Sequence, residues 1–223
     1  RQPDTDSTIL EELSLDEIRP ITGVRINEDN GSNPIWFELD GKGYAYSRYI
    51  QPVKKVFNEP ASSIPEDGCL GEITVPFVDA YSSMNQNRSF IYRFYYAATF
   101  WILNRVEDQD QEVWYELLDD RDYRVFYIPA ETMRVVPDSE LSPISPDVSS
   151  EDKKLVVDLG TQIMTAYEGE SAIFKTKISS GVRLQEGGFA TPKGNYRIIR
   201  KRPCRHMANP ANAYDSWFDL PGV

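Results

Sequence analysis

SSG at residues 179–181 and, ten residues on, TPKGNYRI at residues 191–198 are the stretches that decide the fold of the C-terminal third of this chain. Pro192 fixes its own φ angle and cannot donate to a ladder, so the TPKG segment marks a turn or the edge of a sheet. Gly194 then allows the chain to bend into a strand predicted at residues 196–199.

The residues before these stretches predict a β-meander. Apolar runs at residues 155–159 and 163–167 are joined by Gly-Thr-Gln at residues 160–162, which indicates a hairpin. A turn at residues 168–171 leads into a third strand, predicted over residues 172–179. Together with short Tyr-rich runs elsewhere, this pattern favours an all-β fold.

The meander, the Ser-Gly ending at Gly181, and Thr191, Pro192 and Gly194 at this spacing resemble the first half of the L,D-transpeptidase catalytic domain of the YkuD type. The resemblance covers residues 153–223 and implies the N-terminal part of a β-sandwich. It also implies acyl transfer between peptidoglycan stem peptides outside the cytoplasm, at the cell wall. Neither a metal nor an organic cofactor is implied.

The catalytic residues of that family are not identified in this sequence. The family carries its nucleophile in a Ser-His-Gly-Cys run, which is expected beyond Val223, so that the chain is predicted to be an inactive fragment by itself. An alternative is a dyad of Cys204 and His206, which would face the same side of a strand. No orienting carboxylate is evident near the pair in the sequence.

Four residues are candidates for substrate binding. The resemblance implies that His206 and Met207 border the substrate cleft, and that Tyr214 and Trp217, with Phe218, belong to a loop covering it. The alternative is that these aromatic residues pack against the rest of the domain.

Residues 20–137 contain a repeat. IWFELD at residues 35–40 is echoed by VWYELLD at residues 113–119, and each copy continues through a turn into a Tyr-containing strand and a short apolar tail. Strand, turn, aromatic strand, one-turn helix and final strand resemble the closing portion of a bacterial SH3-like barrel. Two SH3-like modules are therefore predicted, with wall binding or spacing as their role.

The predicted organisation has six segments, and residues 138–152 are expected to be extended because they are rich in proline. The segments are a linker at 1–19, module 1 at 20–57, a linker at 58–70, module 2 at 71–137, the Pro-rich linker at 138–152 and the transpeptidase-like region at 153–223.

Composition limits the partners. Residues 151–223 carry 11 Lys or Arg against 8 Asp or Glu, whereas residues 1–150 carry 13 against 27. The acidic front argues against nucleic acid as a partner. The presence of only two cysteines and one histidine argues against a metal site. Since residues 1–4 are polar and lack an initiator methionine, membrane contact is expected only through an N-terminal anchor absent from this sequence.

Two alternatives stay open at this stage. The basic run from Arg197 to Arg205 either attracts a carboxylate-rich ligand or is a solvated segment that discourages edge pairing. The chain as a whole is either part of a transpeptidase or a non-catalytic protein that binds the cell wall.

Overall fold

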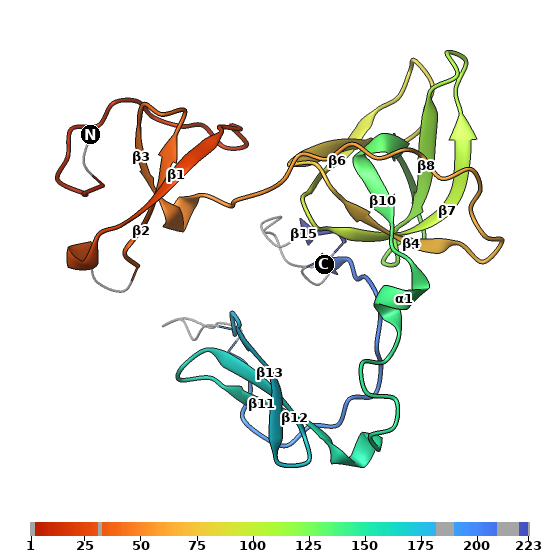
Figure 1. Cartoon of the computed structure of the whole chain (residues 1–223). Helices are drawn as coiled ribbons and strands as arrows, with labels where there is room; N and C mark the ends of the chain where they lie inside the picture. Colours follow the sequence, from red (N-terminus) through yellow and green to blue (C-terminus); the bar gives the residue numbers. More distant parts are fainter. Residues whose placement is uncertain (1–2, 31–32, 182–189, 209–218, 223) are drawn as a thin grey trace. The chain divides into compact units, whose positions relative to one another are not determined.

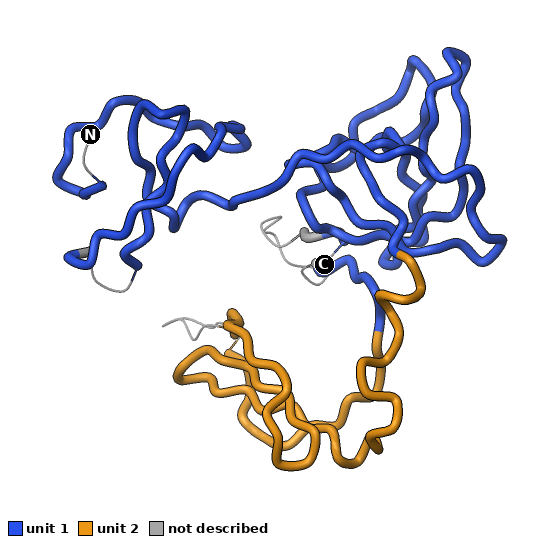
Figure 2. Tube along the Cα trace, in the orientation of Figure 1, with its two compact units in different colours: residues 1–136, 202–223 blue, residues 137–201 orange. Residues whose placement is uncertain are grey.

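The protein is described by a computed structural model, which covers residues 3–30, 33–181, 190–208 and 219–222. These residues form an all-β structure of antiparallel sheets with a single four-residue α-helix. The chain divides into two compact units (Figure 2). Unit 1 contains residues 1–136 and 202–223, and unit 2 contains residues 137–201.

The first sheet of unit 1 has three antiparallel strands in the order β1-β2-β3 (Figure 1). A 3-10 helix at Ser47–Tyr49 follows β3, as the repeat predicts for its one-turn helix. No strand follows this helix at residues 50–53, so the predicted final strand of module 1 is not formed. The strands are β1 (Ile21–Ile26), β2 (Ile35–Leu39) and β3 (Gly43–Tyr46).

The second sheet of unit 1 has seven strands in the order β10-β4-β7-β8-β9-β5-β6, and it curls around a core (Figure 1). A 3-10 helix at Ala130–Thr132 separates β9 from β10, which pairs with β4. The strands are β4 (Cys69–Ile73), β5 (Phe77–Tyr81), β6 (Phe90–Tyr95), β7 (Thr99–Glu107), β8 (Val113–Leu118), β9 (Val125–Pro129) and β10 (Met133–Val135).

Alternating apolar residues build the core of this β4–β10 sheet. Along β9, for example, Phe126 and Ile128 are buried while their neighbours are only half-buried. The ring of Phe94 lies 4.1 Å from that of Phe100 and 5.8 Å from that of Phe126, measured between centroids. Because strand side chains alternate between faces, these residues point inward and exclude water.

The apolar pattern of residues 72–81 predicts a single strand, but this prediction is wrong because the structure has two strands there. β4 ends at Ile73 and β5 begins at Phe77, with Pro76 between them. Pro76 has no N–H to give to a ladder, and its carbonyl accepts from the Tyr96 amide (3.1 Å). β4 also begins at Cys69, within the segment predicted as a linker. The aromatic run at residues 90–103 does contain two strands, β6 and the start of β7, as its pattern predicts.

Unit 2 contains a three-stranded antiparallel sheet in the order β11-β12-β13. Its strands β11 (Lys153–Asp158), β12 (Ile163–Glu168) and β13 (Ser171–Lys177) confirm the meander predicted from the sequence. The preceding linker is not wholly extended, since α1 (Asp138–Leu141) forms in it. Pro137 is the N-cap residue of this helix, and its carbonyl accepts from the Glu140 amide (2.9 Å).

The strand predicted at residues 196–199 is absent from the structure. Residues 190–201 are described, but they pair with no strand of the described sheets and have no regular secondary structure. Tyr196, Ile198 and Ile199 are exposed by 74%, 60% and 94%. An alternating sequence forms a strand only where a sheet edge pairs with its backbone, and no such pairing occurs here.

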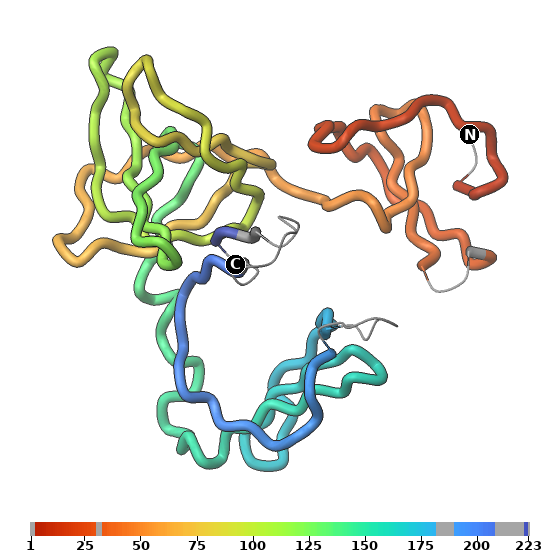
Figure 3. Tube along the Cα trace, turned by 180° about the vertical axis from the view of Figure 1, so that it is seen from behind, coloured from red at the N-terminus to blue at the C-terminus, as the bar shows by residue number. Residues whose placement is uncertain are grey.

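The C-terminal segment, defined here as residues 202–208 and 219–222, belongs to unit 1. It runs beside the β4–β10 sheet in both views (Figures 1 and 3). Its short strands β14 (Met207–Ala208) and β15 (Asp219–Leu220) pair with each other. The region predicted as one domain from residue 153 to residue 223 is therefore divided between the two units.

Candidate functional site

The motif residues of unit 2 meet at the end of the meander. The Gly181 amide donates to Thr191 Oγ1 (3.0 Å), which connects the Ser-Gly stretch with the Thr-Pro-x-Gly stretch. Gln162, in the turn between β11 and β12, accepts from the Ser180 amide (2.8 Å). The phenol of Tyr196 donates to the Pro192 carbonyl (3.2 Å). The two stretches that carry the resemblance are thus linked by hydrogen bonds rather than by strand pairing.

His206 lies in a buried polar pair with a residue that the sequence did not suggest. Its Nδ1 is 2.8 Å from Oδ1 of Asp119, and the two side chains are 2% and 3% exposed. The ring meets that of Tyr92 edge to face, with centroids 5.7 Å apart. An orienting carboxylate is therefore present, 87 residues upstream of the histidine. The imidazole is thus enclosed by the described residues, and a role of His206 at the border of the substrate cleft stays a prediction.

Asp120, next to Asp119, holds three donors from the C-terminal segment. Its Oδ2 accepts from Arg202 (2.8 Å) and Arg205 (2.7 Å), and its Oδ1 accepts from the His206 amide (2.7 Å). Burial alone would raise the pKa of Asp120, but the hydrogen bonds from His206 and Arg205 lower it below its ordinary value. Arg202 and Arg205, from the basic run, thus contact a carboxylate of the chain itself.

The Asp120 contacts predict a loss of stability in acid. A carboxylate with a depressed pKa in the folded state stabilises that state above its ordinary pKa of 3.8, and the contribution disappears as the pH falls through the lower, folded value. Urea unfolding of the wild type and of Asp120→Asn should therefore differ at pH 6 and converge below pH 3.8. If the difference in unfolding free energy between the two proteins were the same in acid as at pH 6, the lowered pKa of Asp120 would be contradicted.

The pKa of the Cys204 thiol is raised, whereas an activated thiol has a lowered pKa. Burial raises the pKa of Cys204, and the charge of Asp120 raises it further, against a smaller lowering by a backbone hydrogen bond to Trp101. A nucleophilic cysteine needs a depressed pKa. A cavity of about 10 Å³ lies beside Cys204, His206 and Asp119, which is roughly the room of one water molecule. This geometry does not support the Cys204–His206 dyad.

The other predicted binding residues are placed only in part. Met207, in β14, is 56% exposed, and its backbone pairs with Leu220. Tyr214, Trp217 and Phe218 lie outside the described residues. Sequence reasoning missed Asp119 and Asp120, whose only local signal is a polar turn between two apolar strands.

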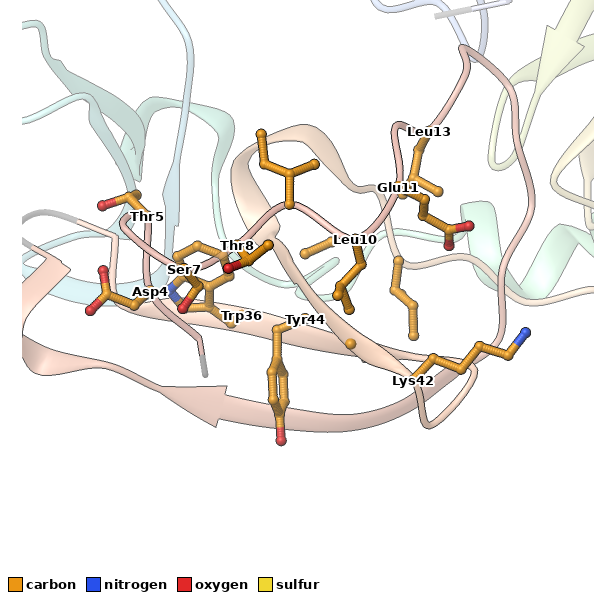
Figure 4. A pocket seen from close by; sticks show the side chains of 14 residues that line it. Asp4, Thr5, Ser7, Thr8, Leu10, Glu11, Leu13, Trp36, Lys42 and Tyr44 are labelled. Atoms are coloured by element: carbon orange, nitrogen blue, oxygen red, sulfur yellow. The ribbon is translucent and has the colours of Figure 1, made fainter. Parts of the chain in front are cut away.

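A larger cavity, of about 380 Å³, lies in unit 1 between residues 4–13 and the first sheet. Figure 4 shows Asp4, Thr5 and Ser7 at the end nearer the Trp36 indole, and Glu11 and Lys42 at the other end. Trp36 is 6% exposed, and its Nε1 has no hydrogen-bond partner among the described residues. The cavity thus combines an apolar wall with charged and hydroxyl-bearing ends.

The described residues set two limits on other functions. No described helix is both long and apolar enough to cross a bilayer. No group of three or more His, Cys, Asp or Glu within the described ranges could hold a metal ion.

Comparison with known proteins finds one similarity, in the C-terminal region. Residues 152–222 match the family model of the L,D-transpeptidase catalytic domain, YkuD. No curated protein and no solved structure shows significant similarity to the chain. The match begins just before β11 and ends in the C-terminal segment, so it includes the linked motif of unit 2 and the residues of the C-terminal segment that contact Asp120. It points to an acyltransferase function of the L,D-transpeptidase family, whose members act on peptidoglycan.

Proposed function

We propose that this chain is part of a peptidoglycan L,D-transpeptidase, acting outside the cytoplasmic membrane to cross-link or remodel the cell wall. The family match over residues 152–222 carries the proposal. In this chemistry a cysteine thiolate attacks the carbonyl of the third stem residue and forms a thioester, and the fourth residue leaves as a protonated amine. The amine of a second stem then attacks the thioester, loses a proton as the new amide forms, and releases the thiolate. The basic run around Arg200, which is exposed and follows the motif, would favour the carboxylates of such peptides.

Neither cysteine of this chain fits the role of the acyl carrier. Cys204 is half-buried with a raised pKa. Cys69 is half-buried in β4 and packs against the core of the β4–β10 sheet. For Cys204, burial and the charge of Asp120 outweigh the lowering of the pKa by the Trp101 backbone and by the Arg202 cation. We therefore propose that the 223-residue chain by itself does not catalyse exchange.

An acyl-enzyme experiment tests this proposal. The chain is incubated with a stem tetrapeptide and an amine acceptor, and its intact mass and the released products are measured by mass spectrometry. We expect no adduct and no exchange. Exchange that is lost in Cys204→Ala would restore the dyad as the active centre and contradict the proposal.

The thiol of Cys204 should also be slow to alkylate. Because its pKa is raised, its thiolate fraction at pH 8 is smaller than that of an unfolded chain. We expect iodoacetamide to modify Cys204 at least about tenfold more slowly in the native protein than in urea. The time course is read by mass spectrometry of the peptide containing Cys204. Equal rates in the two conditions would contradict the burial of this thiol.

A second candidate function is non-catalytic binding of the cell wall through SH3-like modules. The β4–β10 sheet supports the SH3-like assignment, because its last strand follows a 3-10 helix and pairs with its first strand. The three-stranded first sheet shares the strand, strand and 3-10 helix order, and it carries the 380 Å³ cavity. We propose this cavity as the wall-binding site of the N-terminal module.

The cavity proposal has a matched pair of variants. Leu10 lines the cavity and is 51% exposed, whereas Leu15 is 91% exposed and does not line it. Leu10→Lys should weaken co-sedimentation with purified sacculi, since it places a charge in the apolar part of the cavity. Leu15→Lys should leave binding unchanged. Equal binding by both variants would exclude this cavity as the wall-binding site.

A further inference from the structure

The C-terminal segment is attached to the β4–β10 sheet by its backbone at two separated points. The Thr99 amide donates to the Gly222 carbonyl (2.8 Å), and Thr99 Oγ1 donates to the Pro203 carbonyl (3.2 Å). Thr99 is the first residue of β7, so one strand end receives both arms of the segment. The pairing of Met207 with Leu220 joins the same two arms.

The two ion pairs with Asp120 contribute less to this attachment than their short distances suggest. The side chains of Arg202 and Arg205 are 39% and 49% exposed, so their ion pairs with Asp120 are screened by water. The more specific contact is the His206 amide, because it fixes the backbone against Asp120 Oδ1 (2.7 Å). Asp120 thus binds both the backbone and two basic side chains of the C-terminal segment.

The buried pair makes the attachment selective. Asp119 Oδ1 accepts from the Arg121 amide (3.1 Å) as well as lying 2.8 Å from His206 Nδ1. With both side chains almost fully enclosed, removal of the imidazole leaves a buried carboxylate without its side-chain partner, which is costly. The site therefore favours a segment with histidine at this position.

Shape adds a third requirement at the other arm. Gly222 is buried with φ +76°, in the left-handed region. A Cβ there would contact the Phe100 ring at 2.6 Å or closer and the Thr99 carbonyl oxygen at 2.9 Å. Only glycine meets both the conformation and the space.

We infer that the β4–β10 sheet is a docking module for the C-terminal segment, with Asp119 and Asp120 as its recognition residues. The segment that it receives is the end of the region matching the transpeptidase family. The sheet therefore positions part of that region, which goes beyond a role in wall binding or spacing. The docking itself needs neither peptidoglycan nor catalysis, so its test is independent of the proposed function.

Hydrogen exchange of the full chain, followed by mass spectrometry, tests the docking. Asp120→Ala removes the acceptor of the His206 amide, whereas Asp122→Ala removes a neighbouring carboxylate that is 44% exposed and lies 3.8 Å from the Arg121 guanidinium. We expect residues 203–208 to exchange about tenfold faster or more in Asp120→Ala, and at the wild-type rate in Asp122→Ala. Peptides from β9 should stay protected in both variants, which shows that the sheet is folded.

Two results would overturn the inference. The first is wild-type protection of residues 203–208 in Asp120→Ala. The second is the same exchange in the Asp120 and Asp122 variants. If Asp120→Ala also loses protection in β9, Gly222→Val replaces it, because that substitution leaves both acids in place and still removes the room for the segment. Protection of residues 203–208 in a folded Gly222→Val protein would equally overturn the inference.

A spectroscopic readout tests the role of Asp119. His206 is the only histidine in the chain, so its ring resonances are assigned without further variants. In the wild type we expect a slowly exchanging Nδ1 proton, because Asp119 accepts it in a buried site. Asp119→Asn should shift the ring nitrogen resonances and speed the exchange of that proton. Ring resonances unchanged in Asp119→Asn would remove Asp119 from the recognition site.

Discussion

Phe94→Ala is expected to lower the free energy of unfolding of the β4–β10 sheet by about 3–5 kcal/mol, the usual cost of emptying an aromatic site in a core. Phe94 is 1% exposed and contacts the rings of Phe100 and Phe126. Its loss leaves a cavity in the sheet that receives the C-terminal segment. The same variant should therefore also reduce the protection of the His206 amide.

Urea unfolding followed by tryptophan fluorescence and circular dichroism measures this change. Phe90→Ala is the control, since Phe90 lies on the same strand, β6, and is 57% exposed. We expect the control to change the unfolding free energy by less than about 1 kcal/mol. Similar losses in the two variants would show that Phe94 is not a central core residue.

Gly68→Ala is expected to lower the free energy of unfolding by about 2–5 kcal/mol, because it combines backbone strain with steric overlap. Gly68 has φ +78°, and a Cβ at this position would lie 2.6 Å from the backbone carbonyl oxygen of Ile102 and closer still to the indole nitrogen of Trp101. The backbone oxygen belongs to β7 and cannot swing away as a side-chain end could. The substitution should therefore disturb the entry into β4.

Gly41→Ala separates the two causes. Gly41 has φ +67°, but nothing lies within 4 Å of the Cβ that alanine would add. Gly41→Ala should therefore lower the free energy of unfolding only by the strain of the left-handed conformation, about 1–2 kcal/mol. Thermal and urea unfolding of both variants give the comparison. Equal losses would mean that the space around Gly68 contributes nothing.

Much of the secondary structure could be predicted because its cause is local. The alternation of apolar residues in β8 and β9, and the turn chemistry between β11 and β12, act over a few residues. Pro76 is also a local signal, and it explains the break between β4 and β5, which the apolar pattern alone does not show. The residues before α1 carry a comparable signal in Pro137.

The contacts around His206 could not be predicted in the same way. Asp119 and His206 are separated by 87 residues, and no periodic pattern relates positions so far apart. The same limit explains the segment at residues 196–199. Its alternating sequence is suited to a strand, but pairing depends on a sheet edge that local sequence does not specify. The partial burial of Cys204 and the charge of Asp120 beside it are likewise tertiary properties, and both raise the pKa of its thiol.

The two units contain different residues of the region on which the proposed function rests. Unit 2 holds the linked Gly181 and Thr191, and unit 1 holds the C-terminal segment through Asp119 and Asp120. Gly181, Thr191 and the C-terminal segment fall within the family match, whereas Asp119 and Asp120 precede it in the sequence. A transpeptidase built in this way would depend on the β4–β10 sheet for its architecture as well as on its own strands.

Co-sedimentation of the full chain with purified sacculi tests most directly whether this protein acts on peptidoglycan. We expect the chain to pellet with sacculi and to be released by soluble stem tetrapeptide, as binding to stem peptides requires. A chain that stays in the supernatant would contradict an action on peptidoglycan, as would one that the tetrapeptide fails to release.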